Sequence, residues 1–177
     1  MFSALAMAPD SKSFVISDQN GVLHLWNLNG KSEIRAIRSP DGAGKMVGNL
    51  VFSPDGKTLI AIHLGKRFTD GVAVLWNTTD WTAHSMSGYT SAAFSRDGQL
   101  LALGGPDIKL FDVSGRELRT MNVPAFTKGE VLPGFADRPD AREKVPCGVS
   151  ALAFSPDAAT LAVGCFEGTL RIMKLTP

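Results

Sequence analysis

The chain has 177 residues, of which 44% are hydrophobic and 20% charged, and eighteen Lys plus Arg stand against seventeen Asp plus Glu. A domain of this size buries roughly 70% of the surface that its unfolded chain exposes, so it can form a hydrophobic core without disulfides or metals. This apolar content excludes disorder of the whole chain. Because no stretch approaches about 18 uninterrupted apolar residues, we expect no membrane span.

Charge and cysteine content exclude several further classes. The longest basic run is Lys66-Arg67, whereas a nucleic-acid binder usually carries a basic patch, so we expect no nucleic-acid partner. Two cysteines are too few for a disulfide framework or a four-ligand zinc site. The first ten residues lack the positive start of a signal peptide and are interpreted as a strand, which leaves the cytoplasm as the expected compartment.

One turn recurs four times along the chain. Its pattern of Ser, Pro, Asp and Gly suits a type I β-turn, in which Pro presets φ and Ser or Asp bonds nearby backbone groups. The copies are Ala8-Pro9-Asp10-Ser11, Ser53-Pro54-Asp55-Gly56, Ser95-Arg96-Asp97-Gly98 and Ser155-Pro156-Asp157-Ala158. The aspartates are spaced by 45, 42 and 60 residues, which indicates a unit of about 40–45 residues with an insertion in the third copy.

Strands are expected on both sides of each turn. Those before it are Ala4–Ala8, Asn49–Ser53, Ser91–Ser95 and Ser150–Ser155, and those after it are Ser13–Ser17, Thr58–His63, Gln99–Gly104 and Thr160–Cys165. Phe52, Phe94 and Phe154 precede the turn at one offset, where the first copy has Met7.

A second turn leads to a third strand in every copy. These turns are Asn20-Gly21, Asp70-Gly71, Pro106-Asp107 and Glu167-Gly168, and the strands are Val22–Trp26, Val72–Trp76, Ile108–Phe111 and Leu170–Met173. Asn-Gly and Asp-Gly between apolar runs are strong hairpin signals. Both alternating sets of these strands are mostly apolar, which favours sheets packed on sheets.

A weaker fourth strand is expected three times, at Ser32–Ile37, Trp81–Met86 and Glu117–Val123. The total of about fifteen short strands without a helical period predicts an all-β protein. A unit of four antiparallel strands over 42–45 residues favours a β-propeller over a sandwich or barrel.

The repeats resemble those of the WD40-repeat β-propellers. The residues that carry the resemblance are Phe52-Ser-Pro-Asp-Gly with Val74-Leu75-Trp76-Asn77, and Ala151-Leu-Ala-Phe-Ser-Pro-Asp157 with Gly168-Thr-Leu-Arg-Ile172. The family's Trp-Asp pair reads Trp26-Asn27, Trp76-Asn77, Phe111-Asp112 and Met173-Lys174 here, and its Gly-His pair is reduced to Ala83-His84. We therefore expect the family's buried His–Asp–Ser–Trp network to be incomplete, with apolar packing carrying more of the stability.

The repeats divide the chain into blade 1 at 1–40, blade 2 at 41–87, blade 3 at 88–123, an inserted loop at 124–146 and blade 4 at 147–177, the last without a fourth strand. Four blades fall short of the seven or so usual in the family, and exposed edge strands pair with other chains. Three interpretations remain open: missing blades of a longer propeller, a homodimer forming an eight-bladed ring, or a closed four-bladed ring.

Catalytic, metal and cofactor sites have no support in the sequence. His24, His63 and His84 lie far apart without metal-ligand spacing, and His24 is expected to pack against a neighbouring blade. Asp10, Asp55, Asp97 and Asp157 are explained as turn formers. Cys147 and Cys165 would be diagonal neighbours about 7 Å apart on paired strands, beyond usual disulfide geometry, which predicts two reduced thiols.

Two loops stand out as partner-binding candidates. One is His63–Asp70, and the other is the long proline-containing segment 122–146. In the resembled family, the second-to-third-strand loop and the blade-to-blade loop open on one face that commonly binds partners. Exposed Phe and Arg anchor interfaces, so the candidates are Lys66, Arg67, Phe68, Phe126, Phe135, Arg138 and Arg142.

The leading hypothesis is a non-catalytic WD40-like scaffold that binds a protein through this loop face, without cofactor or metal. One alternative is a fragment of a longer or multidomain protein with only a structural role. The other is a small-ligand-binding or hydrolytic propeller with a site in the central channel, which would need convergent polar groups.

Overall fold

The computed structural model describes residues 2–42, 44–67, 70–123, 148–166 and 168–175. Every regular element in these ranges is a β-strand. Over the same residues there is no helix long and apolar enough to cross a membrane. The all-β class predicted from the repeats is confirmed.

The described residues form fifteen strands in four antiparallel sheets, and strands that follow one another in the chain are neighbours in the sheet. Sheet 1 contains β1 (Phe2–Met7), β2 (Ser13–Asp18), β3 (Val22–Asn27) and β4 (Ser32–Arg38). Sheet 2 contains β5 (Val47–Phe52), β6 (Thr58–His63), β7 (Val72–Asn77) and β8 (Ala83–Ser87). Sheet 3 contains β9 (Ser91–Phe94), β10 (Leu100–Gly104), β11 (Asp107–Asp112) and β12 (Glu117–Asn122). Sheet 4 contains β13 (Val149–Phe154), β14 (Thr160–Cys165) and β15 (Leu170–Lys174).

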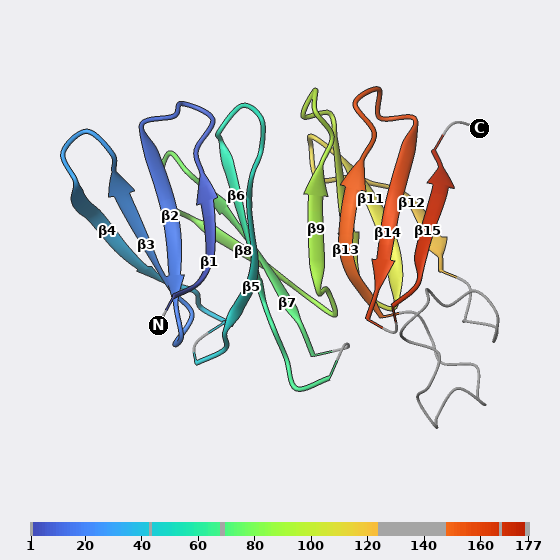
Figure 1. Cartoon of the computed structure of the whole chain (residues 1–177), viewed down its shortest axis with the longest axis horizontal. Helices are drawn as coiled ribbons and strands as arrows, with labels where there is room; N and C mark the ends of the chain where they lie inside the picture. Colours follow the sequence, from blue (N-terminus) through green and yellow to red (C-terminus); the bar gives the residue numbers. More distant parts are fainter. Residues whose placement is uncertain (1, 43, 68–69, 124–147, 167, 176–177) are drawn as a thin grey trace.

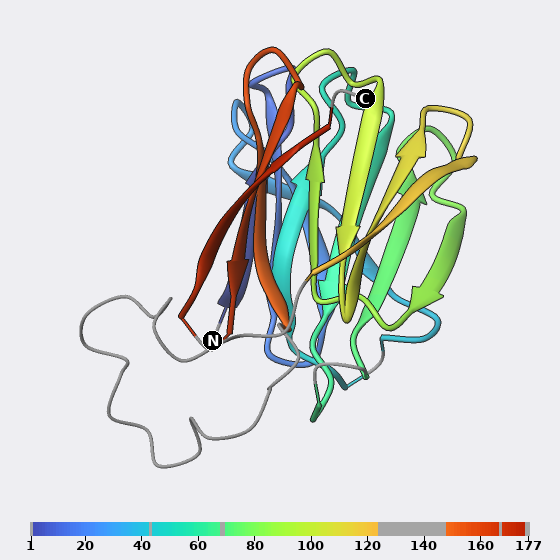
Figure 2. The ribbon, with the colours of Figure 1, turned by 90° about the vertical axis from the view of Figure 1, so that its right-hand side faces the viewer.

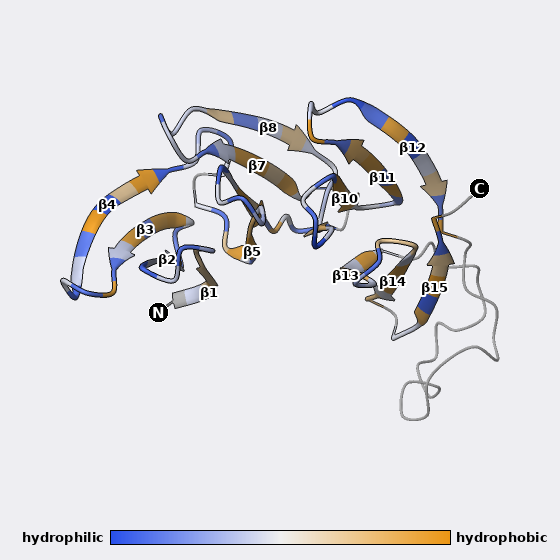
Figure 3. Ribbon diagram, turned by 90° about the horizontal axis from the view of Figure 1, so that it is seen from above, coloured by the Kyte–Doolittle hydropathy of each residue, from blue (hydrophilic) through white to orange (hydrophobic). Residues whose placement is uncertain are grey.

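The sheets stand side by side in an open arc, with sheets 1 and 4 at its two ends (Figures 1 and 3). The first strand of each sheet lies on the inner side of the arc, where β1 packs against β5, β5 against β9 and β9 against β13. Figure 3 shows β4, β8 and β12 on the outer side. Four antiparallel sheets of four, four, four and three strands in this arrangement are the blades of a partial, open propeller.

The recurring turns lie together at one end of the sheets, which we call the turn end. In the second copy the Gly56 N–H donates to the Ser53 carbonyl at 2.9 Å, and Gly56 has φ of 72°. This is a type I turn followed by a left-handed residue, for which Gly is the least strained choice. The Asp55 carboxylate accepts from the Ser53 hydroxyl at 2.6 Å and from the Lys57 N–H at 3.0 Å.

The same pattern holds in the other copies. Asp97 accepts from the Ser95 hydroxyl at 2.6 Å, and Asp157 accepts from the Ser155 hydroxyl at 2.5 Å. Asp10 lacks a preceding Ser and accepts instead from the Lys12 N–H at 2.8 Å. The four aspartates are therefore turn formers, as predicted.

Three apolar clusters fill the spaces between adjacent sheets. One joins Leu23 of sheet 1 to Leu59 of sheet 2, the next joins Ile60 to Leu103, and the third joins Ile108 of sheet 3 to residues of sheet 4. In β6, five of the six residues are buried, which confirms burial on both sides for sheet 2. Among the described residues, sheets 1 and 4 each pack against one neighbouring sheet, so each keeps one surface open.

Two local predictions are wrong. His24 does not pack against a neighbouring sheet. It pairs with Ile16, which pairs with Leu5, on the open surface of sheet 1, and its Nδ1 lies 2.7 Å from the Glu33 carboxylate. Trp81 is not the start of a strand: it has φ of 60° and its N–H donates to the Asn77 carbonyl at 2.7 Å, so β8 begins at Ala83.

Candidate functional site: the loop end of the sheets

The end of the sheets opposite the turn end carries the second-to-third-strand connections and the sheet-to-sheet connections, and we call it the loop end (Figure 2). The connection between β6 and β7 is built here: the Leu64 N–H donates to the Met46 carbonyl at 2.8 Å, and the Asp70 N–H donates to the Arg67 carbonyl at 3.0 Å. The first bond ties this connection to the neighbouring segment 39–46. Lys66 and Arg67 follow Leu64 in the β6–β7 connection, and both are exposed.

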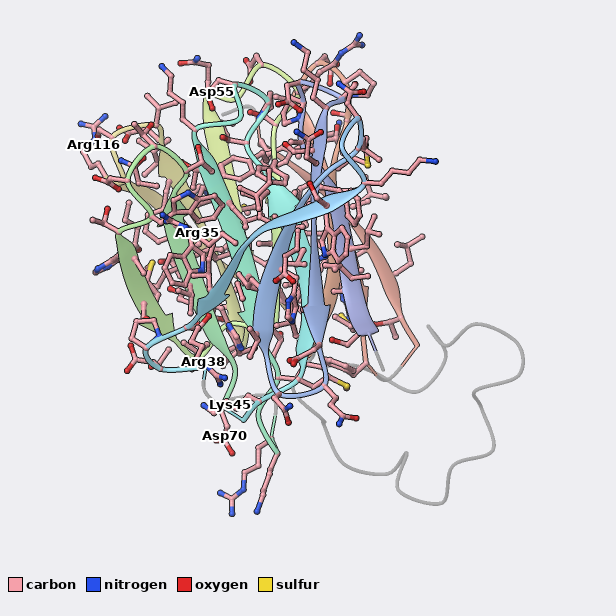
Figure 4. The ribbon with its side chains drawn as sticks, turned by 90° about the vertical axis from the view of Figure 1, so that its left-hand side faces the viewer. Arg35, Arg38, Lys45, Asp55, Asp70 and Arg116 are labelled. Atoms are coloured by element: carbon pink, nitrogen blue, oxygen red, sulfur yellow. The ribbon has the colours of Figure 1, made fainter. Side chains whose placement is uncertain are left out.

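Further basic residues share the loop end with this pair. Figure 4 shows Arg38, Lys45 and Asp70 at the loop end, while Asp55 and Arg116 lie at the turn end. Arg38 is exposed and Lys45 is half-buried. Met46 in the same segment is 51% exposed, which adds an apolar side chain to the basic group.

Arg38, Lys45 and Met46 were missed in the sequence because they precede Lys66 by 28, 21 and 20 residues. The signal that could have found them is the blade-to-blade connection itself, since it reaches the same end as the second-to-third-strand loop. The basic residues look scattered in sequence, but four of them belong to the loop end: Arg38, Lys45, Lys66 and Arg67.

The other predicted partner-binding residues, namely Phe68, Phe126, Phe135, Arg138 and Arg142, lie outside the described residues. The strands on either side of the long segment end at Asn122 and begin again at Val149. The Thr90 hydroxyl donates to the Val149 carbonyl at 2.5 Å. This bond joins sheets 3 and 4 at the loop end.

A buried Ser–His pair lies directly beneath the loop end. The Ser39 hydroxyl and His63 Nε2 are 2.7 Å apart, and His63 Nδ1 lies 3.4 Å from the Lys45 carbonyl oxygen. Since a carbonyl only accepts, Nδ1 carries the proton and Nε2 accepts from Ser39. Burial lowers the pKa of His63, so the ring stays neutral.

A serine hydroxyl that donates to a histidine is also the arrangement of a hydrolytic nucleophile and its general base. Here, however, Ser39 and His63 are both buried. A nucleophile must reach its substrate, and no surface opens onto this hydroxyl. The pair instead ties the end of β4 to the end of β6, as expected for a buried polar group that needs a partner.

A cleft of about 340 Å³ lies at the turn end between sheets 1 and 2. Asp10 and Asp55 line it together with Phe52 and Trp81. The Lys12 N–H lowers the pKa of Asp10 and the Ser53 hydroxyl lowers the pKa of Asp55. A general acid needs a raised pKa. The hydrogen bonds within the turns have the opposite effect, so both carboxylates stay ionised.

The family's buried hydrogen-bond network is incomplete in sheet 2, as predicted. Trp76 is buried, and its indole Nε1 has no hydrogen-bond partner in the part of the chain that the structure describes. In sheet 1, Trp26 stacks on Phe14 with ring centroids 6.3 Å apart. Over the described residues, no group of three or more His, Cys, Asp or Glu could hold a metal ion.

The prediction of two reduced thiols is wrong. Cys165 is disulfide-bonded, and Cys147 is the only other cysteine of the chain. Cys165 pairs with Val149. Cys147 lies outside the described residues, but the regular pairing that the distance argument assumed does not hold, because the register of β13 shifts between Val149 and Ala151.

With the sheets and their two ends described, the chain can be compared with known proteins. Residues 144–173 match the family model for WD40, described as a WD domain, G-beta repeat. A search of curated proteins found no match. The matched segment takes in β13, β14 and most of β15.

The class of protein is a partial β-propeller, because four sheets with one strand order follow one another around an arc. The last sheet matches the WD40 family model, and the other three sheets repeat its antiparallel strand order, which is consistent with WD40 blades. The resemblance inferred from the four turns is confirmed.

Proposed function

We propose that this chain is a non-catalytic scaffold that binds a protein partner through the loop end of its sheets. The observation that carries the proposal is that four basic residues, Arg38, Lys45, Lys66 and Arg67, and the exposed Met46 all belong to the loop end. Arg and Met are enriched at protein interfaces. WD40 domains typically bind protein partners, which supports the same interpretation.

The partner predicted by this chemistry is a protein segment that carries both carboxylates and an apolar side chain. Basic side chains would steer and orient the acidic groups, and Met46 would adapt its flexible thioether to the apolar one. Asp41 and Asp70 lie in the same two connections, so the charge is mixed. A mixed surface suits a folded or peptide partner better than the uniform polyanion of a nucleic acid.

The non-catalytic part of the proposal is supported by the burial of Ser39 and by the lowered pKa of Asp10 and Asp55. These groups were the best candidates for a nucleophile and an acid. The proposal includes no cofactor and no metal. The division into blades at 1–40, 41–87, 88–123 and 147–177, with a loop at 124–146, remains part of this interpretation.

The cytoplasm remains the proposed compartment, but one feature weighs against it. Cys165 is disulfide-bonded, and disulfides are rare in reducing compartments. A thiol count on the protein taken directly from cells, with thiols blocked at lysis, distinguishes the cytoplasm from an oxidising compartment. Blocked thiols on both cysteines support the cytoplasm, and an intact disulfide points to an oxidising compartment.

The binding proposal is tested by affinity capture with two matched double variants. Lys66→Glu with Arg67→Glu reverses charge at the loop end, and Lys57→Glu with Arg96→Glu does the same at the turn end, where Lys57 is also exposed. We expect the first variant to lose a captured protein that the wild type and the second variant retain. Equal capture by all three would refute the loop end as the binding surface.

A further inference from the structure

The open surface of sheet 4 repeats the surface that sheet 3 buries. In sheet 4, Ala151 pairs with Gly164 and Gly164 with Leu170, while Ala153 pairs with Ala162 and Ala162 with Ile172. We call these six residues the outward surface of sheet 4. Leu170 is 61% and Ile172 is 64% exposed.

The corresponding rows of sheet 3 run Ser91, Gly104, Ile108 and Ala93, Ala102, Leu110. Position by position, five of the six pairs match in type: Gly with Gly, Ala twice with Ala, and Ile or Leu with Leu or Ile. In sheet 3 these rows are covered by sheet 4, which leaves Ile108 at 0% and Leu110 at 5% exposure.

The glycine in this pattern has a specific use in sheet 3. A Cβ on Gly104 would lie 2.5 Å from the Val149 Cγ1 of sheet 4, so the first strand of the next sheet approaches there. At Gly164 the nearest atom to such a Cβ is the Ala151 Cβ of its own sheet, at 3.4 Å. Sheet 4 thus presents a receiving surface with an unused place for the first strand of another sheet.

The open surface of sheet 1 is the other half of the same interface. Its rows run Leu5, Ile16, His24 and Met7, Phe14, Trp26. We call these six residues the outward surface of sheet 1. Leu5 is 56% and Met7 is 48% exposed.

The docking surface of sheet 4, which packs on sheet 3, has the matching rows Leu152, Val163, Arg171 and Phe154, Leu161, Met173. Each row of sheet 1 therefore reproduces the order found there: apolar, apolar, basic in one row and three large apolar residues in the other. A basic residue at the end of the first row is compatible with an internal interface. Lys109 occupies that position in sheet 3 and pairs with Glu117 at 2.8 Å, as His24 pairs with Glu33 in sheet 1.

We propose that the outward surface of sheet 4 binds the outward surface of sheet 1 in a second copy of this chain. The junction repeats the packing between sheets 3 and 4. Because the two surfaces differ, the association is head-to-tail, and two copies form two identical junctions in a ring of eight sheets. Such a ring is within the range known for propellers, and it covers both open ends of the arc in Figure 3.

The test is the mass of the purified full chain, measured by light scattering after size exclusion over a range of concentrations. We expect twice the mass of one chain for the wild type. Leu5→Arg and Ile172→Arg, each placing a charge in one surface, should both give the mass of one chain. Val113→Arg is the matched control, since Val113 is 69% exposed and belongs to neither surface; it should leave the dimer intact.

Mixing the two variants tests the head-to-tail geometry. The Leu5→Arg chain keeps an intact surface on sheet 4 and the Ile172→Arg chain keeps one on sheet 1, so an equimolar mixture should regain dimer through one junction. Three results would overturn the proposal: a wild-type monomer at every concentration, a dimer that survives either variant alone, or a ladder of masses above the dimer. Retained far-UV circular dichroism shows that each variant still folds.

Discussion

Two glycines at matching positions in adjacent sheets should respond oppositely to the same substitution. Gly104→Ala adds a methyl group whose carbon would lie 2.5 Å from the Val149 Cγ1 and 2.6 Å from the Ser91 hydroxyl oxygen. Neither glycine has a positive φ, so alanine is allowed by the backbone. The packing between sheets 3 and 4 must therefore shift.

Overpacking of this kind costs about 1–3 kcal/mol, and the lower entropy of the unfolded alanine chain returns about 0.4–1 kcal/mol. The net expectation for Gly104→Ala is a loss of about 1–2 kcal/mol in the free energy of unfolding. At Gly164 the nearest contact is at 3.4 Å, an ordinary packing distance, so only the favourable effect remains. Gly164→Ala should be neutral or stabilising by up to about 1 kcal/mol.

The assay is urea unfolding followed by circular dichroism, at a concentration at which the chain is monomeric by light scattering. Dilution matters because Gly164 lies in the proposed receiving surface. If both variants lose the same stability, or if Gly104→Ala loses none, then sheet 4 does not pack on sheet 3 as described.

Three further substitutions test other parts of the structure. Ser53→Ala removes the hydroxyl that donates to Asp55 and should lower the free energy of unfolding by about 1–2 kcal/mol in urea; an unchanged midpoint would contradict the turn's role. Because burial lowers the pKa of His63, the unfolded chain binds that proton first, so stability should fall as pH drops below about 6.5, by up to about 1.4 kcal/mol per pH unit. His63→Gln should abolish this slope, and a slope retained in that variant would assign it to other groups. Cys165→Ser should cost about 2–4 kcal/mol under non-reducing conditions; an unchanged urea midpoint would contradict a stabilising disulfide.

The fold was accessible from the sequence because turn chemistry repeats in it. The Ser-Pro-Asp-Gly turn at Ser53 and its three copies fix where strands begin and end, and the apolar runs beside them fix which strands pair. These are local signals, and they need no knowledge of distant contacts.

Features that depend on which sheets are neighbours could not be predicted from the sequence. His24 carries the same alternation as buried residues of the other third strands, yet sheet 1 has no neighbour on that side. The basic group at the loop end was hidden for a similar reason, since Arg38 and Lys66 come from different sheets. The disulfide at Cys165 was missed because regular strand pairing was assumed, whereas the register shifts between Val149 and Ala151.

Hydrogen exchange with and without the captured partner reports which end of the sheets the partner covers. We expect the partner to slow amide exchange in segments 39–46 and 64–67 at the loop end, and to leave the turns at 53–57 and 95–99 unchanged. Slowed exchange at the turns with no change at the loop end would contradict this expectation.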